Sequence, residues 1–240
     1  MGLYNIGNDF YAIVNRLGEN VTFDFQENPD SLKTQTVKAC LETATSAAYS
    51  MVSREFLFKG NMVIPFNFNT HELSGMYFKR DIVPNTSYLM ISAIPEPTSP
   101  KICFVYAVQC NSNVSILKRV EGDMDSRDQW GNIINKYYKL NLGIPCYWYT
   151  TLRSYKIQNN GKLDHAIYTM YIPAKYKLSP MDKVLKKTFV DGEYKEEVFN
   201  VDSVETALTR ETESNGIIPG IVSAQLTLNL DKVVVEDEEP

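Results

Sequence analysis

The sequence predicts a mainly β protein: a barrel or sandwich of short antiparallel strands with one short N-terminal helix and protruding loops. Three observations predict this class. The most apolar part of the chain, Ser87–Arg119, consists of strand-like segments separated by a proline cluster and an Asn-Ser-Asn turn. Turn signals recur about every ten residues along much of the chain. Fifteen Tyr and eleven Phe residues give an aromatic content that is typical of strands.

The first residues of the chain predict a helix followed by a strand. Asp9–Leu17 carries apolar residues at helical spacing, with Asn8 as the expected N-cap and Gly18 after the last turn. Val21–Phe25 then alternates apolar and polar residues, as a strand does. We therefore divide the chain into a helix–strand extension (1–30), a β core with loop insertions (31–235) and an acidic tail (236–240).

Residues 34–52 fit two different structures. Val37 and Leu41 lie at helical spacing, but the many Thr and Ser residues suit a helix interior poorly. The alternative is a strand over Thr36–Thr43 and another over Ser50–Phe58, joined by a loop of small residues. We favour the strand–loop–strand interpretation, in which the loop protrudes from the body of the protein.

The remaining strands are predicted where apolar residues alternate with polar ones, or run continuously, between turn residues. They are expected at Met62–Phe68, Met76–Phe78, Tyr88–Ile94, Ile102–Val108, Val114–Arg119, Lys136–Leu142, Tyr147–Lys156, Ala166–Ile172, Lys183–Val190, Glu196–Val204 and Val222–Val234. The turns Asn159-Asn160-Gly161 and Asp191-Gly192 predict two hairpins, because Asn-Gly and Asp-Gly favour the tight turns that match the twist of the flanking strands.

Composition argues against several classes of function. The formal net charge is −5, whereas a nonspecific coat on nucleic acid needs clustered Lys and Arg to neutralise phosphates. No run of apolar residues approaches the length of a membrane span. The N-terminus lacks the positive charge that begins a signal peptide. We therefore expect no membrane partner and a protein made in the cytoplasm.

No group of residues has the spacing of a catalytic or metal centre. The cysteines are Cys40, Cys103, Cys110 and Cys146. They include no C-x-x-C pair, so we interpret them as free thiols. His71 and His165 lie beside turns, and the chain has no G-x-S-x-G nucleophile and no Gly-rich phosphate loop. We expect structural or surface roles for both histidines, no enzyme activity and no cofactor.

Two other patterns each have a ligand-binding and a structural interpretation. Asp123, Asp125 and Asp128 resemble a calcium loop, but the sixth position of the loop is Asp128 instead of Gly. We interpret these residues as part of a solvent-exposed loop. Aromatic and cationic residues mingle in Tyr137-Tyr138-Lys139 and in Tyr147–Lys156, as in barrels that stack nucleic-acid bases. Aromatic strands with exposed lysines give the same pattern, and we favour that interpretation.

Several short motifs occur in an order that is shared with a known family. They are the opening FYAIVNRLGENVTF, Tyr88–Ile91 ("Y-L-I-I"), Cys110–Lys118 ("C-N-x-x-(I/L)-x-W", here without the tryptophan), Pro145-Cys146 ("P-C"), Met170–Pro173 ("V-P"), and Val198–Val204 with Gly216–Asp231 ("V-x-x-V-D…G-I-x-x-L-x-L"). In this order they resemble the head-closure (stopper) and neck-region proteins of tailed bacteriophages with Gram-positive hosts. The resemblance extends over most of the chain.

The resemblance implies a β-barrel subunit of a multimeric ring between portal and tail, which helps to retain packaged DNA. Its implied partners are further copies of itself, a portal or adaptor protein and tail proteins, with DNA passing through the channel without specific binding. Its implied location is the virion, and no catalytic residues come with it. The alternative function is that of an OB-like β module that binds single-stranded nucleic acid or a small ligand.

A ring subunit needs segments that reach its neighbours, and three loops are candidates. The candidate assembly-contact loop is Ala44, Thr45, Ser46, Ala47, Ala48 and Tyr49, whose small residues allow close approach. The candidate channel-facing loop contains Asp123, Asp125 and Asp128, whose charge would keep a DNA duplex from adhering. The third candidate is Thr209–Gly220.

Overall fold

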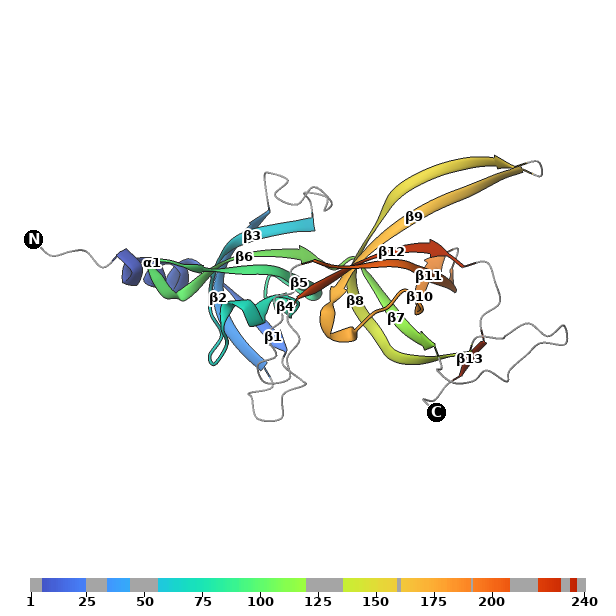
Figure 1. The fold of residues 1–240 in the computed structure, drawn as a ribbon. Coiled ribbons are helices and arrows are strands. Elements are labelled where there is room, and N and C mark those ends of the chain that lie inside the picture. Colours follow the sequence, from blue (N-terminus) through green and yellow to red (C-terminus); the bar gives the residue numbers. More distant parts are fainter. Residues whose placement is uncertain are drawn as a thin grey trace, which may run out of the picture. The chain divides into compact units, whose positions relative to one another are not determined.

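The chain folds into two compact units, each built around a small β barrel. The computed structural model describes residues 6–24, 34–43, 56–119, 136–158, 161–190, 192–207, 220–229 and 234–236. The first unit comprises Met1–Cys110, Pro173–Lys175 and Thr206–Ile221, and the second comprises Asn111–Ile172, Tyr176–Glu205 and Val222–Pro240. The predicted mainly β class with one short N-terminal helix is confirmed (Figure 1).

The first unit is a closed six-stranded barrel in the order β1-β2-β3-β6-β5-β4. Its elements are α1 (Ile6–Leu17), β1 (Glu19–Asp24), β2 (Thr34–Thr43), β3 (Leu57–Val63), the short 3-10 helix η2 (Thr70–Leu73), β4 (Tyr77–Arg80), β5 (Val83–Glu96) and β6 (Ser99–Gln109). β1 closes the barrel, because Val21 pairs with Val37 of β2 on one side and with Arg80 of β4 on the other. All six strand pairings are antiparallel.

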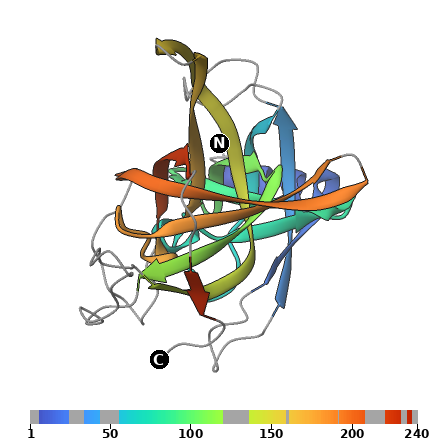
Figure 2. The same cartoon turned by 90° about the vertical axis from the view of Figure 1, so that its right-hand side faces the viewer.

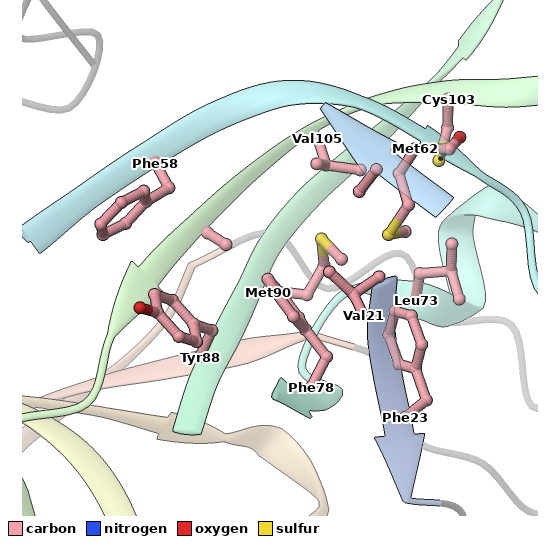
Figure 3. Packing of buried hydrophobic residues seen from close by; sticks show 12 residues of the cluster. Val21, Phe23, Phe58, Met62, Leu73, Phe78, Tyr88, Met90, Cys103 and Val105 are labelled. Atoms are coloured by element: carbon pink, nitrogen blue, oxygen red, sulfur yellow. Dashed lines mark hydrogen bonds between the residues drawn. The ribbon is translucent and has the colours of Figure 1, made fainter. Parts of the chain in front are cut away.

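Aromatic side chains and methionines fill the core of this barrel (Figure 3). Tyr88 is almost completely buried, meets the ring of Phe58 edge-on at 5.2 Å between centroids, and stacks on Phe78 at 5.4 Å. Cys103 lies in the same core, and its thiol donates a hydrogen bond to the carbonyl oxygen of Met62 at 3.6 Å. Burial of this apolar surface contributes roughly 25 cal/mol per Å² to folding.

Helix α1 begins earlier than predicted and buries less than its pattern suggests. Because it spans Ile6–Leu17, Asn8 is a helical residue and not the N-cap that we expected. Within the predicted apolar stripe Val14 is buried, whereas Ile13 is 51% and Leu17 73% exposed. At Gly18 a Cβ atom would lie 2.5 Å from the carbonyl oxygen of Val14, so a glycine is needed where the helix ends.

In the first unit the structure confirms one of the predicted strands and shortens another. β2 spans Thr34–Thr43, which confirms the strand predicted there and excludes the helix over these residues. The next strand is β3, so the strand expected over Met62–Phe68 ends at Val63; Asn67 has φ 66° in the left-handed region, which interrupts a strand. Within residues 1–30, β1 is one of the strands of the closed barrel.

The second unit is also a barrel. Its strands are β7 (Ser112–Arg119), β8 (Lys136–Gln158), β9 (Gly161–Pro173), β10 (Lys183–Val190), β11 (Glu193–Ala207), β12 (Ile221–Leu228) and β13 (Val234–Glu236). The 3-10 turn η3 (Ala174–Tyr176) follows β9, and its first two residues belong to the first unit. The strand order is β13-β8-β7-β10-β11-β12-β9, and an additional pairing of β8 with β9 closes a ring of six strands that leaves β13 outside it. The single core expected over residues 31–235 is therefore divided between two units.

The core of the second barrel contains an aromatic cluster around Trp148. The Trp148 ring contacts Phe199 edge-on at 4.9 Å and Tyr168 at 5.5 Å between centroids. The ammonium nitrogen of Lys186 lies 4.5 Å from the centre of the Trp148 ring. Desolvation in this cluster lowers the pKa of Lys186, since burial disfavours the charged form.

Two long hairpins project from the second barrel (Figures 1 and 2). Gln158 of β8 pairs with Gly161 of β9, and Val190 of β10 pairs with Glu193 of β11. Both hairpins predicted from the Asn-Asn-Gly and Asp-Gly turns are therefore confirmed. In the first of them Gly161 is the opening residue of β9 and not part of the turn.

Substitution of Gly60 tests the packing of the first barrel. A Cβ atom there would lie 1.9 Å from the carbonyl oxygen of Cys40 on the adjacent strand, and backbone atoms cannot easily give way. We expect Gly60→Ala to lower the free energy of unfolding by about 2 kcal/mol or more. Gly192→Ala is the control, because no atom lies within 4 Å there and only its φ of +88° opposes the substitution, at about 1 kcal/mol. Urea unfolding of both variants measures the difference; equal losses would contradict the close approach.

Candidate functional site

The three candidate loops lie outside the described residues. This applies to the assembly-contact loop Ala44–Tyr49, to Asp123, Asp125 and Asp128 of the acidic loop, and to residues 209–219 of the third loop. Their proposed contacts remain predictions. The candidate site is therefore built from surfaces of the described residues.

The two histidines belong to different units, His71 to the first and His165 to the second. His71 is exposed in η2, and His165 pairs along the backbone with Ser154, with a side chain outside the described residues. Glu72, the neighbour of His71, accepts a hydrogen bond from the N–H of Asn69 at 2.7 Å and so caps η2. In the described part of the chain no three His, Cys, Asp or Glu side chains are placed to hold a metal ion.

All four cysteines are free thiols, as predicted, but they differ in burial. Cys103 and Cys146 are buried, whereas Cys40 and Cys110 are partly exposed. Burial raises the pKa of the Cys103 and Cys146 thiols to about 12. The pKa of Cys40 is raised chiefly by desolvation and further by the nearby carboxylate of Glu19.

Three aromatic residues of the segments that resembled a base-stacking surface belong to the folded core. Tyr137, Tyr147 and Trp148 are all buried. Tyr147 also packs against Tyr149 and Tyr171, with centroid separations of 5.5 and 6.2 Å. These buried rings offer no free face on which a base can stack.

A groove of about 600 Å³ lies in the first unit, next to the end of α1. Apolar side chains from Leu17 and Ile82 line it together with the polar groups of Glu19, Asn61 and Arg80. Leu17 and Ile82 are both well exposed. The groove thus combines an open apolar rim with buried charges.

The charges in this groove form an ion pair that is largely buried. Arg80 donates to one oxygen of Glu19 through Nη2 at 2.6 Å and through Nε at 2.9 Å. The guanidinium carbon lies 4.9 Å from the ring centre of Phe58 and 5.5 Å from that of Tyr88. The second oxygen of Glu19 is buried without a hydrogen-bond partner among the described residues. Taking the charges out of water is costly, and their pairing and the aromatic contacts offset that cost.

Among the described residues of the second unit, the most exposed large apolar side chains lie near the tip of the β10–β11 hairpin. Phe189 is 62% and Tyr194 76% exposed, yet their rings lie 5.0 Å apart as cross-strand partners. The next pair on this face, Lys187 and Glu196, forms an ion pair at 2.8 Å. Side chains two residues apart on a strand share a face, so one face of the hairpin carries the aromatic pair and then the ion pair.

Sequence reasoning missed this aromatic pair. A Phe and a Tyr in strands predict burial, because aromatic residues usually pack in a core. The available signal is their position: both lie within a few residues of the Asp191-Gly192 turn, at the end of a hairpin that extends beyond its barrel. The alternation of residues in a strand does not predict how far the hairpin extends beyond the barrel.

Comparison with known proteins adds no assignment to these surfaces. The chain matches no known family, no curated protein and no solved structure. Within the described ranges, no helix combines the length and apolar character needed to cross a membrane. The surfaces must therefore be interpreted from their own geometry.

A single and a double variant test the Glu19–Arg80 pair. Glu19→Gln leaves the buried guanidinium without its counter-charge, and we expect it to lower the free energy of unfolding by about 3–5 kcal/mol. The double variant Glu19→Leu/Arg80→Met removes both charges, and we expect it to be within about 1 kcal/mol of the parent protein. Denaturant unfolding of the parent protein and the two variants measures the two losses. A double variant that loses as much as Glu19→Gln would show that the charges themselves are required.

Thiol reactivity tests the burial of the cysteines. At pH 8 the thiols of Cys103 and Cys146 are almost fully protonated, and both are inaccessible, so we expect an alkylating reagent to modify Cys40 and Cys110 first. All four should react once the protein is unfolded in urea. Peptide mass spectrometry identifies the modified residues. Native Cys146 reacting as fast as Cys110 would contradict a closed second barrel.

Proposed function

We propose that the protein is a structural subunit of a ring at the neck of a tailed bacteriophage, where it joins portal to tail and helps to retain or conduct DNA. The observation that carries this proposal is the exposed aromatic pair Phe189–Tyr194 on a projecting hairpin. The order of motifs that resembles head-closure and neck proteins supplies the biological setting. The ring consists of further copies of the chain. Its partners are portal or adaptor proteins and tail proteins.

The aromatic pair has the properties of an interface anchor. Tyr, Phe and Trp are enriched at the centres of protein interfaces, since they bury much area and lose little conformational entropy on binding. The contact between Phe189 and Tyr194 already orders the two rings, which lowers the entropy cost of binding further. A two-stranded arm that ends in such a pair suits insertion between neighbouring subunits.

The charges around the pair favour a protein partner over nucleic acid. Lys186, Lys187 and Lys195 lie within three residues of Phe189 or Tyr194 in the sequence, but so do Glu193, Glu196 and Glu197. Lys187 is already engaged by Glu196. The three lysines and three glutamates leave no net positive charge beside the rings, whereas a stacking surface for single strands needs a positive groove. These charges support the ring subunit over the OB-like alternative.

Replacing the aromatic pair tests this function. We expect Phe189→Ser/Tyr194→Ser to fold as the parent does, because both side chains are exposed, and to weaken assembly with its own copies or with the portal at least tenfold. Phe66→Ser is the matched control, because Phe66 is 73% exposed but lies in the first unit. Sedimentation and mass measurements of the purified proteins, alone and mixed with the portal, give the result.

Two outcomes would contradict the proposal. The first is a double variant that assembles with the same affinity as the parent protein. That result would show that the aromatic pair of the hairpin is not needed for assembly. The second is a parent protein that joins neither its copies nor a virion component, yet binds a single-stranded oligonucleotide in a salt-sensitive way. That result would favour the OB-like alternative.

A further inference from the structure

The groove at the end of α1 exposes two large apolar side chains of the first unit. Leu17, the last residue of α1, is 73% exposed, and Ile82, in the turn between β4 and β5, is 64% exposed. The half-buried ring of Phe104 on β6 also lines the groove. Exposed apolar side chains that gather around one concavity are typical of a surface that binds another protein.

The side of the groove that carries Ile82 is held in place by β1. The side-chain amide of Asn20 donates to Oδ2 of Asp81 at 2.8 Å, and the N–H of Asp81 donates to the carbonyl oxygen of Asn20 at 3.1 Å. The ion pair of Glu19 and Arg80 joins the same two segments. A groove that is formed before binding loses little conformational entropy when a partner enters it.

The polar lining of the groove needs a hydrogen-bond donor. One carboxylate oxygen of Glu19 accepts from Arg80, whereas the other is buried without a partner among the described residues. Because the guanidinium already compensates the charge of Glu19, a neutral donor suits this site. The hydroxyl of a tyrosine is such a donor, carried on an apolar ring. A phosphate diester of nucleic acid has no proton to donate and would be repelled by the carboxylate.

The chain itself carries a surface with these properties on its second unit. The exposed rings of Phe189 and Tyr194 are apolar, contact each other, and include one phenolic hydroxyl. A ring needs two different surfaces on each subunit, because a contact between two hairpins would be symmetric and would end at a dimer. The groove supplies the second surface.

The size of this contact determines how strong it is. The two rings can bury roughly 300–500 Å² on the hairpin, and with the matching groove surface about 600–1,000 Å² in total. Stable complexes bury about 1,200 Å² or more. One contact alone is therefore weak. Closure of a ring strengthens it, since every subunit is then held by two neighbours.

We propose that the Phe189–Tyr194 pair of one subunit inserts into the groove that Leu17 and Ile82 line on the next subunit. Each subunit then gives one hairpin and accepts one. This head-to-tail contact forms a closed ring when the rotation between copies permits it. The inference rests on the proposed ring and names the surface that receives its hairpin.

Substitution in the groove tests the receiving surface. Leu17→Ser/Ile82→Ser leaves the hairpin intact, and we expect it to fold as the parent does, because both side chains are exposed. We expect its dissociation constant for self-association to rise at least tenfold. Phe66→Ser is the matched control, because Phe66 is 73% exposed, as Leu17 is, but is not among the groove residues. Sedimentation velocity over a range of concentrations measures the parent and both variants.

Mixing two variants tests the direction of the contact. The groove variant gives a hairpin but accepts none, whereas the hairpin variant Phe189→Ser/Tyr194→Ser accepts a hairpin but gives none. We expect each to be monomeric where the parent forms rings, and the mixture to form one-to-one pairs at high concentration and nothing larger. Native mass spectrometry counts the subunits. A groove variant that dimerises alone would show that two hairpins contact each other, and would overturn the inference.

Disulfide trapping tests the contact with both rings in place, because Cys40 is a partly exposed thiol that lines the groove. A chain with Cys110→Ser is mixed with a chain carrying Cys40→Ser, Cys110→Ser and Glu193→Cys, and the mixture is oxidised. We expect a disulfide between Cys40 of the first chain and the cysteine introduced beside Tyr194 in the second, identified by peptide mass spectrometry. Met181→Cys in place of Glu193→Cys is the control, because Met181 is exposed in the second unit but lies outside the hairpin. A yield no higher than that of the control would contradict the contact.

The outcomes separate this inference from the proposed function. If the hairpin variant loses assembly while the groove variant keeps the affinity of the parent, the hairpin enters another surface. The inference then fails and the proposed function stands. If neither variant changes assembly, both proposals fail.

Discussion

Closure of the two barrels is the constraint on which the rest of the protein depends. In the first unit, β1 satisfies the free edges of both β2 and β4, so that no barrel strand is left with an open side. A closed barrel can neither add a strand nor slip in register without breaking several backbone pairings at once. The surfaces left for contact are therefore loops, grooves and projecting hairpins. The second unit departs from this rule at one place only among its described strands, where β13 covers the start of β8.

The first barrel combines a dense aromatic core with a charge pair near its end. Tyr88 packs between Phe58 and Phe78 and also lies beside the guanidinium of Arg80. The same ring thus belongs to the core and to the environment of the ion pair. Such a pair adds little net stability compared with apolar residues of the same size, but it demands one arrangement of its neighbours. In this barrel it fixes β1 against β4, the two strands that close the sheet.

The second barrel places its exposed apolar groups on an arm instead of on its body. Leu185 and Val198 pack with Leu117 and Tyr137. Phe189 and Tyr194 lie nearer the hairpin turn, where their rings contact each other. An aromatic pair with little other cover contributes little to the free energy of folding, because its buried area is small. It is better explained by a partner that completes its burial.

The sequence by itself determined the class of the fold, most strands and both hairpins, because these follow from local alternation and from turn residues such as Asp191-Gly192. It also determined that the cysteines are free. The tertiary structure alone decided that β1 closes a barrel, that the core is divided in two, and that Phe189 is exposed while Tyr147 is buried. Glu19 and Arg80 are 61 residues apart in sequence, so no local sequence pattern could predict their ion pair. The physical reason is that alternation assigns a side chain to one face of a strand, whereas only long-range strand pairing decides what covers that face.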